Sequence, residues 1–170
     1  MKQILVVGLS VWLVASAFTI VGSAQGNNRP PSSAEIDFAV QTADLLQATL
    51  FGALLQEFAE TTPANVEQGK RSIGLVFSDE HTNFRLVGTQ EPLADNDVPS
   101  DAFETNALAA ADVGQGTSGV ERVRGKWYYR RSIPLSNFHP ACSLCHTNFG
   151  PVNAAQWVGA LVLKVPVTGN

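Results

Sequence analysis

The chain has 170 residues, of which 45% are hydrophobic, and its eleven basic and fifteen acidic side chains give a formal net charge of -4. This length is enough for one domain with a substantial hydrophobic core and too short for two. The mildly acidic balance, with no basic stripe, excludes a protein that binds nucleic acid through its phosphates.

The N-terminal residues are typical of an export signal. An apolar run over residues 4–21 lies between Lys2 and the small residues 22–24, which is the pattern of a charged start, an apolar middle and a cleavage site. The run is also nearly long enough to span a bilayer, so an uncleaved membrane anchor stays open. In both cases we expect the rest of the chain in the periplasm of a bacterium. Three segments follow: a signal peptide over 1–24, a linker over 25–31 and one domain over 32–170.

The domain is expected to begin with a long helix. Ser32 and Glu35 have the spacing of a capping box, in which each side chain accepts a hydrogen bond from a free backbone N–H at the helix start. Apolar residues then recur at helical spacing as far as about Glu60, which predicts one buried face. Thr62-Pro63 indicates a second, short helix that ends at about Gly69.

Beyond this point the hydrophobic period changes towards two, which predicts strands. Because these strands follow one another without helical crossovers, we expect an antiparallel sheet and an α+β fold. Asp101 to Ala111 is expected to form a further helix, capped by Ser100-Asp101. The predicted strands, about five in all, cover residues 73–77 and 84–87 as a hairpin, then 120–123, 127–133 and 157–165.

The only two cysteines of the chain lie in the sequence Cys142-Ser-Leu-Cys145-His146, which matches the attachment motif of c-type haem. In that chemistry two thiols add to the two vinyl groups of the porphyrin, and the histidine that follows them ligates the iron. Export favours this interpretation, because c-type haem is attached outside the cytoplasmic membrane. We therefore predict one covalent haem c held by Cys142 and Cys145, with His146 as an iron ligand.

Three alternatives compete with haem at this motif. A disulfide or a redox-active pair suits cysteines outside the cytosol, but it has no use for His146. A structural zinc site needs a fourth ligand that the motif does not supply. Coincidence is the third alternative.

Most of the mature chain also resembles the PAS-like single-haem c-type cytochrome family, whose members occur alone in some bacteria and as periplasmic sensor modules in others. The resemblance is carried by the N-terminal helix, a Pro- and Asn-containing loop before an acid-bearing helix, "YYRRSIPL" before the haem motif and "WVGALVLKVPV" as the closing strand. It implies a PAS-like sheet. Two departures stand out: the loop between Pro92 and Pro99 is longer and more acidic, and Gly69 stands where members often carry a cysteine as the distal iron ligand.

The second axial ligand of the iron stays open. Met1, in the signal, is the only methionine, which excludes the His/Met ligation of familiar electron carriers. His139 lies just before Cys142, on the segment that feeds the proximal side, and suits a loop role better. His81 lies in the predicted hairpin turn and is our candidate ligand, with an exposed turn residue or an open iron site as the alternatives.

Basic residues gather between Arg122 and Arg131. Most such runs are only solvated faces, but the haem propionates need partners, so we predict contacts of the cofactor with Arg130, Arg131 and Tyr128. Strand alternation would place Arg130 and Tyr128 on one face of the sheet and Arg131 on the other.

Two functions are compatible with these features. The first is periplasmic electron transfer, with an acidic loop from Glu91 to Glu104 steering a basic redox partner. The second is a haem-based redox or gas sensor that passes its signal to a separate partner protein. We do not expect an enzyme, because no catalytic acid/base pair is identifiable.

Overall fold

The structure of the chain is a computed structural model. It describes residues 29–59, 62, 64–65, 68–69, 83–88 and 97–167. The predicted signal peptide, the strand at 73–77, His81 and residues 91–96 of the acidic loop lie outside these residues.

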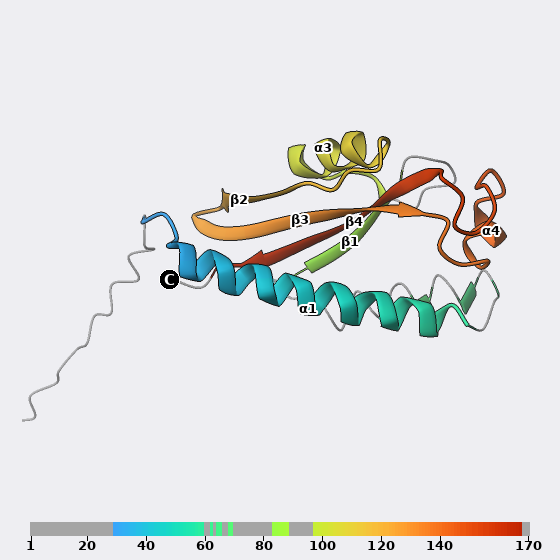
Figure 1. The fold of residues 1–170 in the computed structure, drawn as a ribbon, viewed down its shortest axis with the longest axis horizontal. Coiled ribbons are helices and arrows are strands. Elements are labelled where there is room, and N and C mark those ends of the chain that lie inside the picture. The colour runs from blue at the N-terminus through green and yellow to red at the C-terminus, as the bar shows by residue number, and fades with distance from the viewer. Residues whose placement is uncertain are drawn as a thin grey trace, which may run out of the picture.

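The described chain forms a four-stranded antiparallel sheet with helices on both faces (Figure 1). The strand order is β1-β4-β3-β2, so the last strand of the chain lies inside the sheet. The predicted α+β fold class, with an antiparallel sheet, a long N-terminal helix and short additional helices, is confirmed. The elements are α1 (Ser33–Glu57), β1 (Asn83–Gly88), α3 (Ala102–Ala111), β2 (Ser118–Val123), β3 (Lys126–Ser136), α4 (Cys142–Cys145) and β4 (Trp157–Pro166).

The sheet has a different core on each face because side chains alternate along its strands. In β4, Leu161, Leu163 and Val165 join the core beneath α1, whereas Ala160 and Val162 join the core beneath α3. Figure 1 shows α1 and α3 on opposite sides of the sheet. The α1 side is the larger of the two cores, because it also receives the buried stripe of α1, which consists of Ala39, Ala43, Leu50 and Leu54.

The ends of α1 follow from local chemistry. At its start the predicted capping box is present: Glu35 N–H donates to Ser32 Oγ (3.4 Å), and Ser32 N–H donates to Glu35 Oε2 (2.6 Å). Hydrogen bonds from Ser32 lower the pKa of Glu35. The helix ends at Glu57, three residues before the predicted end, and its C-cap Phe58 continues the buried stripe at 3% exposure. Thr62 then caps the next turn, accepting a hydrogen bond from Asn65 N–H (3.2 Å).

Among the described residues α1 is the one helix long and apolar enough to cross a membrane by length and composition. Core helices and signal sequences meet the same criterion. One stripe of α1 packs on the sheet, and much of its remaining surface is exposed.

Gly159 of β4 provides a test of the sheet. A Cβ at this position would collide with the carbonyl oxygen of Val87 and lie 3.2 Å from Gly88 Cα, both on β1. We expect Gly159→Ala to force β1 and β4 apart and to lower the free energy of unfolding by about 1–3 kcal/mol, the usual cost of overpacking. Urea unfolding followed by circular dichroism measures this change.

Gly119→Ala in β2 is the matched control for this prediction. No atom lies within 4 Å of a Cβ at that position, so the substitution should change stability by less than about 0.5 kcal/mol. Equal midpoints for the two variants would contradict the close approach of β1 to β4.

Candidate functional site

The Cys142-to-His146 motif lies beyond the end of β3, on the one-turn helix α4, close to the C-terminal end of α1 (Figure 1). Cys142 N–H donates to the carbonyl of His139 (3.0 Å), and His146 N–H donates to the carbonyl of Cys142 (3.0 Å). The motif forms a short helical turn. It brings both cysteines and the histidine into one compact segment.

Aromatic packing fixes this segment to α1. The ring of Phe138 packs against the rings of Phe51 and Phe58. Its centroid lies 5.2 Å from that of Phe51 and 6.0 Å from that of Phe58. Ala141, directly before the first cysteine, is 1% exposed and belongs to the core beneath α1. The start of the motif is therefore anchored to the C-terminal turns of α1.

Asn137 holds the motif from its other side. Its side chain is buried, and Nδ2 donates to Ser143 Oγ (3.0 Å) and to the carbonyl of Gly150 (2.8 Å). The carbonyl of Asn137 accepts a hydrogen bond from Asn153 N–H (2.7 Å). One residue thus joins α4 and the loop after it to the end of β3. Sequence reasoning missed Asn137, because nothing in "LSNFHP" distinguishes it from an ordinary turn residue.

The two cysteines are free thiols in different surroundings. Cys145 is exposed, while Cys142 is partly buried. Burial raises the pKa of the Cys142 thiol, against a smaller effect of the backbone donors around it. Leu144, between them, is 44% exposed. The motif therefore presents an apolar side chain beside its accessible thiol.

The ring of His146 is held by Phe149, which stacks on it with centroids 4.4 Å apart and an angle of 7° between the planes. The Nδ1 atom of His146 is buried. This packing gives the imidazole one defined orientation directly after the second thiol.

This donor set fits a c-type haem. The thiols of Cys142 and Cys145 would add to the two vinyl groups, and His146 would offer an imidazole nitrogen to iron. Within the described ranges no group of three or more His, Cys, Asp and Glu residues could hold a metal ion. The zinc alternative therefore finds no ligand set among these residues.

His139 is engaged in the loop. Its Nδ1 accepts a hydrogen bond from Ala141 N–H (3.1 Å), and its ring packs against Phe58, with centroids 5.9 Å apart. In a neutral imidazole that accepts at Nδ1, the proton lies on Nε2, so Nε2 has no lone pair for iron. The geometry accords with the loop role that the sequence favours for His139.

Gly69 leaves no space for a distal ligand. It is buried, and a Cβ there would lie 2.8 Å from Glu57 Cβ. A side chain at this position would need α1 to shift. His81, the predicted ligand, lies outside the described residues and stays a prediction.

The residues predicted to contact the haem propionates interact with other protein side chains. Arg131 forms an ion pair with Asp44 of α1 and donates from Nε to Tyr129 Oη (3.2 Å). Tyr128 is buried on the opposite face, with Lys164 Nζ 5.0 Å from its ring centroid. The predicted alternation of faces is present. The contacts of these residues with the haem propionates stay a prediction.

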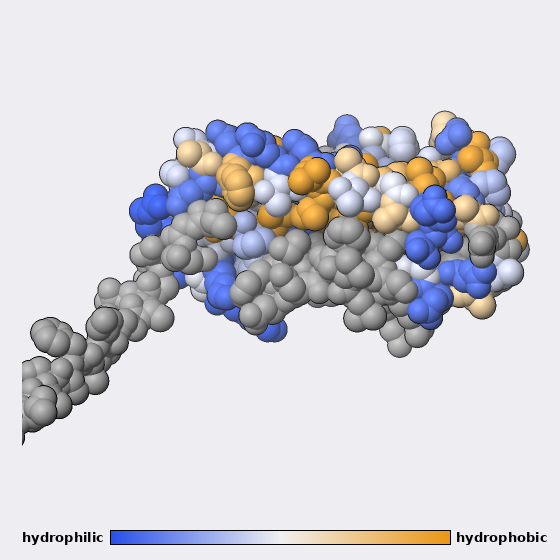
Figure 2. Space-filling view, turned by 90° about the horizontal axis from the view of Figure 1, so that it is seen from below, coloured by the Kyte–Doolittle hydropathy of each residue, from blue (hydrophilic) through white to orange (hydrophobic). Residues whose placement is uncertain are grey.

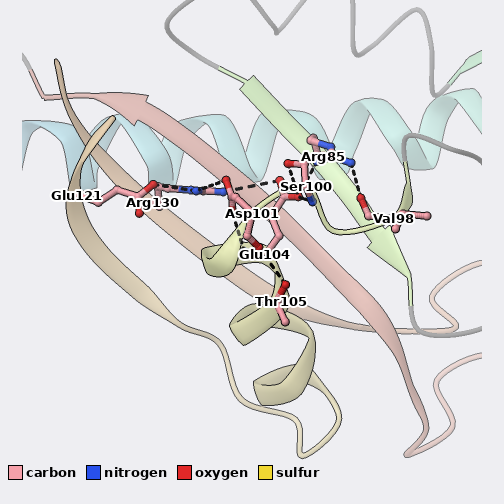
Figure 3. Close-up of polar contacts among 8 residues, drawn as sticks. All are labelled: Arg85, Val98, Ser100, Asp101, Glu104, Thr105, Glu121 and Arg130. Carbon is pink, nitrogen blue, oxygen red and sulfur yellow. Dashed lines mark hydrogen bonds and ion pairs between the residues drawn. The ribbon is translucent and has the colours of Figure 1, made fainter. Parts of the chain in front are cut away.

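Arg130 lies in a buried charge cluster on the α3 face of the sheet (Figure 3). Its Nη1 donates to Asp101 (2.6 Å) and Glu121 (2.8 Å), and its guanidinium lies 4.3 Å from the ring centroid of Phe103. Burial works against the charge of Arg130, but the two carboxylates outweigh it and raise its pKa. Burial alone would raise the pKa of Asp101. Hydrogen bonds from Arg130 and from the Glu104 N–H outweigh this effect, so the net pKa of Asp101 is lowered.

Glu104 extends the cluster to β1. Its Oε2 accepts hydrogen bonds from Arg85 (2.5 Å) and from the backbone and hydroxyl of Ser100 (2.7 and 2.8 Å). Glu104 and Asp97 are only 3% and 8% exposed. These two acids of the predicted steering loop are therefore internal, and a steering role would rest on the exposed Asp101, which pairs with Arg130, and on residues 91–96, outside the described part of the chain.

Comparisons with known proteins give a distant likeness among solved structures. No protein-family model matches the sequence. No curated protein matches it either. Among solved structures, the crystal structure of the cyanobacterial heme-protein Tll0287 is similar to this one, at 15% sequence identity and a TM-score of 0.42, and the match covers 82% of this chain and 99% of that chain. A likeness at this level carries no argument about function, so the proposal below rests on the residues of this chain.

The charge cluster predicts an acid-dependent stability. Because the pKa of Asp101 is lowered on folding, its contribution is present above the pKa of an unfolded aspartate, about 3.9, and is lost as the pH falls towards the folded value. Asp101→Asn keeps a good helix cap and removes the charge. We expect the variant to be less stable than the wild type at pH 7, with the difference shrinking below about pH 4.

Thermal unfolding between pH 3 and pH 7 measures this difference. Asp112→Asn, at the exposed far end of α3, is the control. If the difference in unfolding temperature between Asp101→Asn and the wild type were constant across this pH range, the charge of Asp101 would not stabilise the fold.

Proposed function

We propose that the chain is an exported c-type cytochrome with one haem attached covalently through Cys142 and Cys145, and that it acts in periplasmic electron transfer. The observation that carries the proposal is the compact motif itself: two free thiols and an oriented imidazole on one exposed helical turn, anchored to the core by Phe138 and Asn137. Bound haem would supply an iron that gains and loses one electron.

The protein residues provide attachment and orientation. Cys142 and Cys145 would form thioether bonds, His146 would present its imidazole to the iron, and Phe149 would hold that ring in place. A redox partner would exchange electrons at the exposed side of α4, where Cys145 and Leu144 reach the surface. The proposed role includes no substrate chemistry.

A haem-based sensor is the second candidate, and one observation favours it. Gly69 has no side chain, and His139 is bonded to the Ala141 N–H. Neither of these positions, within the described part of the chain, offers a strong sixth ligand. If His81 does not bind the iron, the sixth position is open to a small molecule, and binding there would be transmitted to a partner protein.

Covalent attachment is the first test. When the chain is co-expressed with a haem-attachment system, we expect the wild type to retain haem after denaturing electrophoresis and to gain the mass of one haem. Cys142→Ala with Cys145→Ala should abolish both signals. Ser132→Ala, in the middle of β3, is a control outside the motif and should keep them. A wild-type chain without bound haem would overturn the proposal and return the thiols to disulfide chemistry.

Carbon monoxide then separates the two candidates. If the protein is an electron carrier, CO should not change the absorption spectrum of the reduced protein, because a protein ligand fills the sixth position. His81→Ala should then allow CO to bind the iron. His139→Ala should leave the spectrum unchanged, because its Nδ1 is a backbone acceptor. A wild-type Soret band that shifts readily with CO would favour the sensor instead.

A further inference from the structure

The tip of the β2–β3 hairpin carries three basic residues. Arg122, Arg124 and Lys126 are all exposed, and we name them the basic tip. In the sequence they belong to the same basic run as Arg130 and Arg131, but those two arginines form ion pairs with carboxylates of other elements. The basic tip is therefore the part of that run that stays at the surface, outside the buried charge cluster and outside the haem motif.

The turn between the two strands presents Arg124 at its outermost point. Arg124 and Gly125 have φ angles of 49° and 86°, which is the left-handed pair of a two-residue hairpin turn. Such turns favour Asn or Asp at the first position, and a long side chain is uncommon at a positive φ. Uncommon backbone conformations of this kind concentrate at functional positions. The chain thus keeps a charge at the tip where a smaller residue would suit the backbone better.

The basic tip lies at the end of the molecule where α1 begins. Two contacts fix α1 alongside β3 in the same direction: Asp44 pairs with Arg131, and Phe58 stacks on Phe138. Before the ion pair, α1 extends for about 16 Å and β3 for about 17 Å, so both elements start at the same level. Figure 1 shows the β2–β3 turn and the start of α1 at one end, and Figure 2 shows hydrophilic residues at that end, on the left of the view.

The haem motif lies at the opposite end of the molecule (Figure 1). β3 runs from Lys126 to Ser136, which is about 33 Å at the rise of a strand, and the motif follows its far end. A haem attached to Cys142 and Cys145 would be out of reach of the basic tip. The basic tip therefore serves neither the haem propionates nor a redox partner at α4, and its charges suit another anionic occupant.

The chain that precedes α1 favours an anionic membrane as this occupant. The apolar run over residues 4–21 is the predicted signal or anchor, and residues 22–32 join it to α1. A segment of that length spans at most about 40 Å. While the run is in a bilayer, the basic tip stays close to the lipid headgroups at a high effective concentration. A short basic cluster is then sufficient, because each Lys or Arg near an anionic surface adds to the attraction.

Ion pairs balance most of the acids at this end of the described chain. Glu35 pairs with Arg29 (2.9 Å), and Glu121 pairs with Arg130 (2.8 Å). Asp37, in the first turns of α1, is a further exposed acid. The three positive charges of the basic tip therefore exceed the negative charge that faces the same side.

We propose that the basic tip is a docking surface for an anionic membrane and that it holds the domain with the haem motif on the side away from the bilayer. The contact is electrostatic and peripheral, because Trp127, beside the tip, packs against the core beneath α1 and is not available for insertion into lipid. The proposal is independent of the haem assignment, since the basic tip and the motif lie at opposite ends of β3.

Lysine footprinting tests the contact. The full chain, co-expressed with a haem-attachment system, would be combined with vesicles of phosphatidylcholine, with or without phosphatidylglycerol, then acetylated and examined by mass spectrometry. We expect phosphatidylglycerol to slow the acetylation of Lys126 roughly fivefold and high salt to restore the rate. Lys164, in the interior strand β4, is the internal control and should react at the same rate with both lipids.

Arg124→Asn removes one charge from the basic tip and suits the positive φ of the turn. We expect this variant to lose most of the protection of Lys126 while its circular dichroism spectrum is retained. Lys164→Gln is the matched control, because it removes one positive charge from the middle of the sheet, and it should keep the protection.

Three outcomes would overturn the proposal. Lys126 would be acetylated at the same rate with both lipids, or Lys126 and Lys164 would be protected alike, which indicates adsorption of the whole molecule. Protection of Lys126 by polyglutamate but not by phosphatidylglycerol would assign the basic tip to an acidic protein instead.

Discussion

The alternation of side chains along β3 and β4 is the constraint on which the rest of the molecule depends. Both strands lie inside the sheet and carry buried residues on both faces. A shift of register by one residue would exchange the two sets and place Arg130 in the apolar core beneath α1. The same alternation separates an apolar layer under α1 from a charged layer under α3.

The charged layer needs all of its members. Arg130 is buried, and a buried cation without its carboxylates would destabilise the fold strongly. Asp101, Glu121 and Arg130 come from α3, β2 and β3, while Glu104 reaches Arg85 on β1. The cluster therefore adds charge pairing to the apolar contacts of Ala107 and Ala111 that hold α3 on the sheet.

Much of the fold could be predicted from local patterns. The capping box of Ser32 and Glu35, the cap at Asp101 and the turn at the motif depend on neighbouring residues, so spacing alone identifies them. The pairing of Arg130 with Asp101 could not be found in this way, because Asp101 lies 29 residues earlier in the chain. Asn137 was missed because its acceptors, Ser143 and the carbonyl of Gly150, are brought to it only by the fold. The end of α1 was placed too late because the apolar spacing continues through Phe58, which caps the helix.

The partial burial of Cys142 bears on the order of events during maturation. A thiol whose pKa is raised by burial stays protonated at neutral pH, and the protonated form is a poor nucleophile. In the unfolded chain both thiols are solvated and react on similar terms. If haem is attached to this chain, addition of the Cys142 thiol would therefore be faster before the domain folds over it than afterwards.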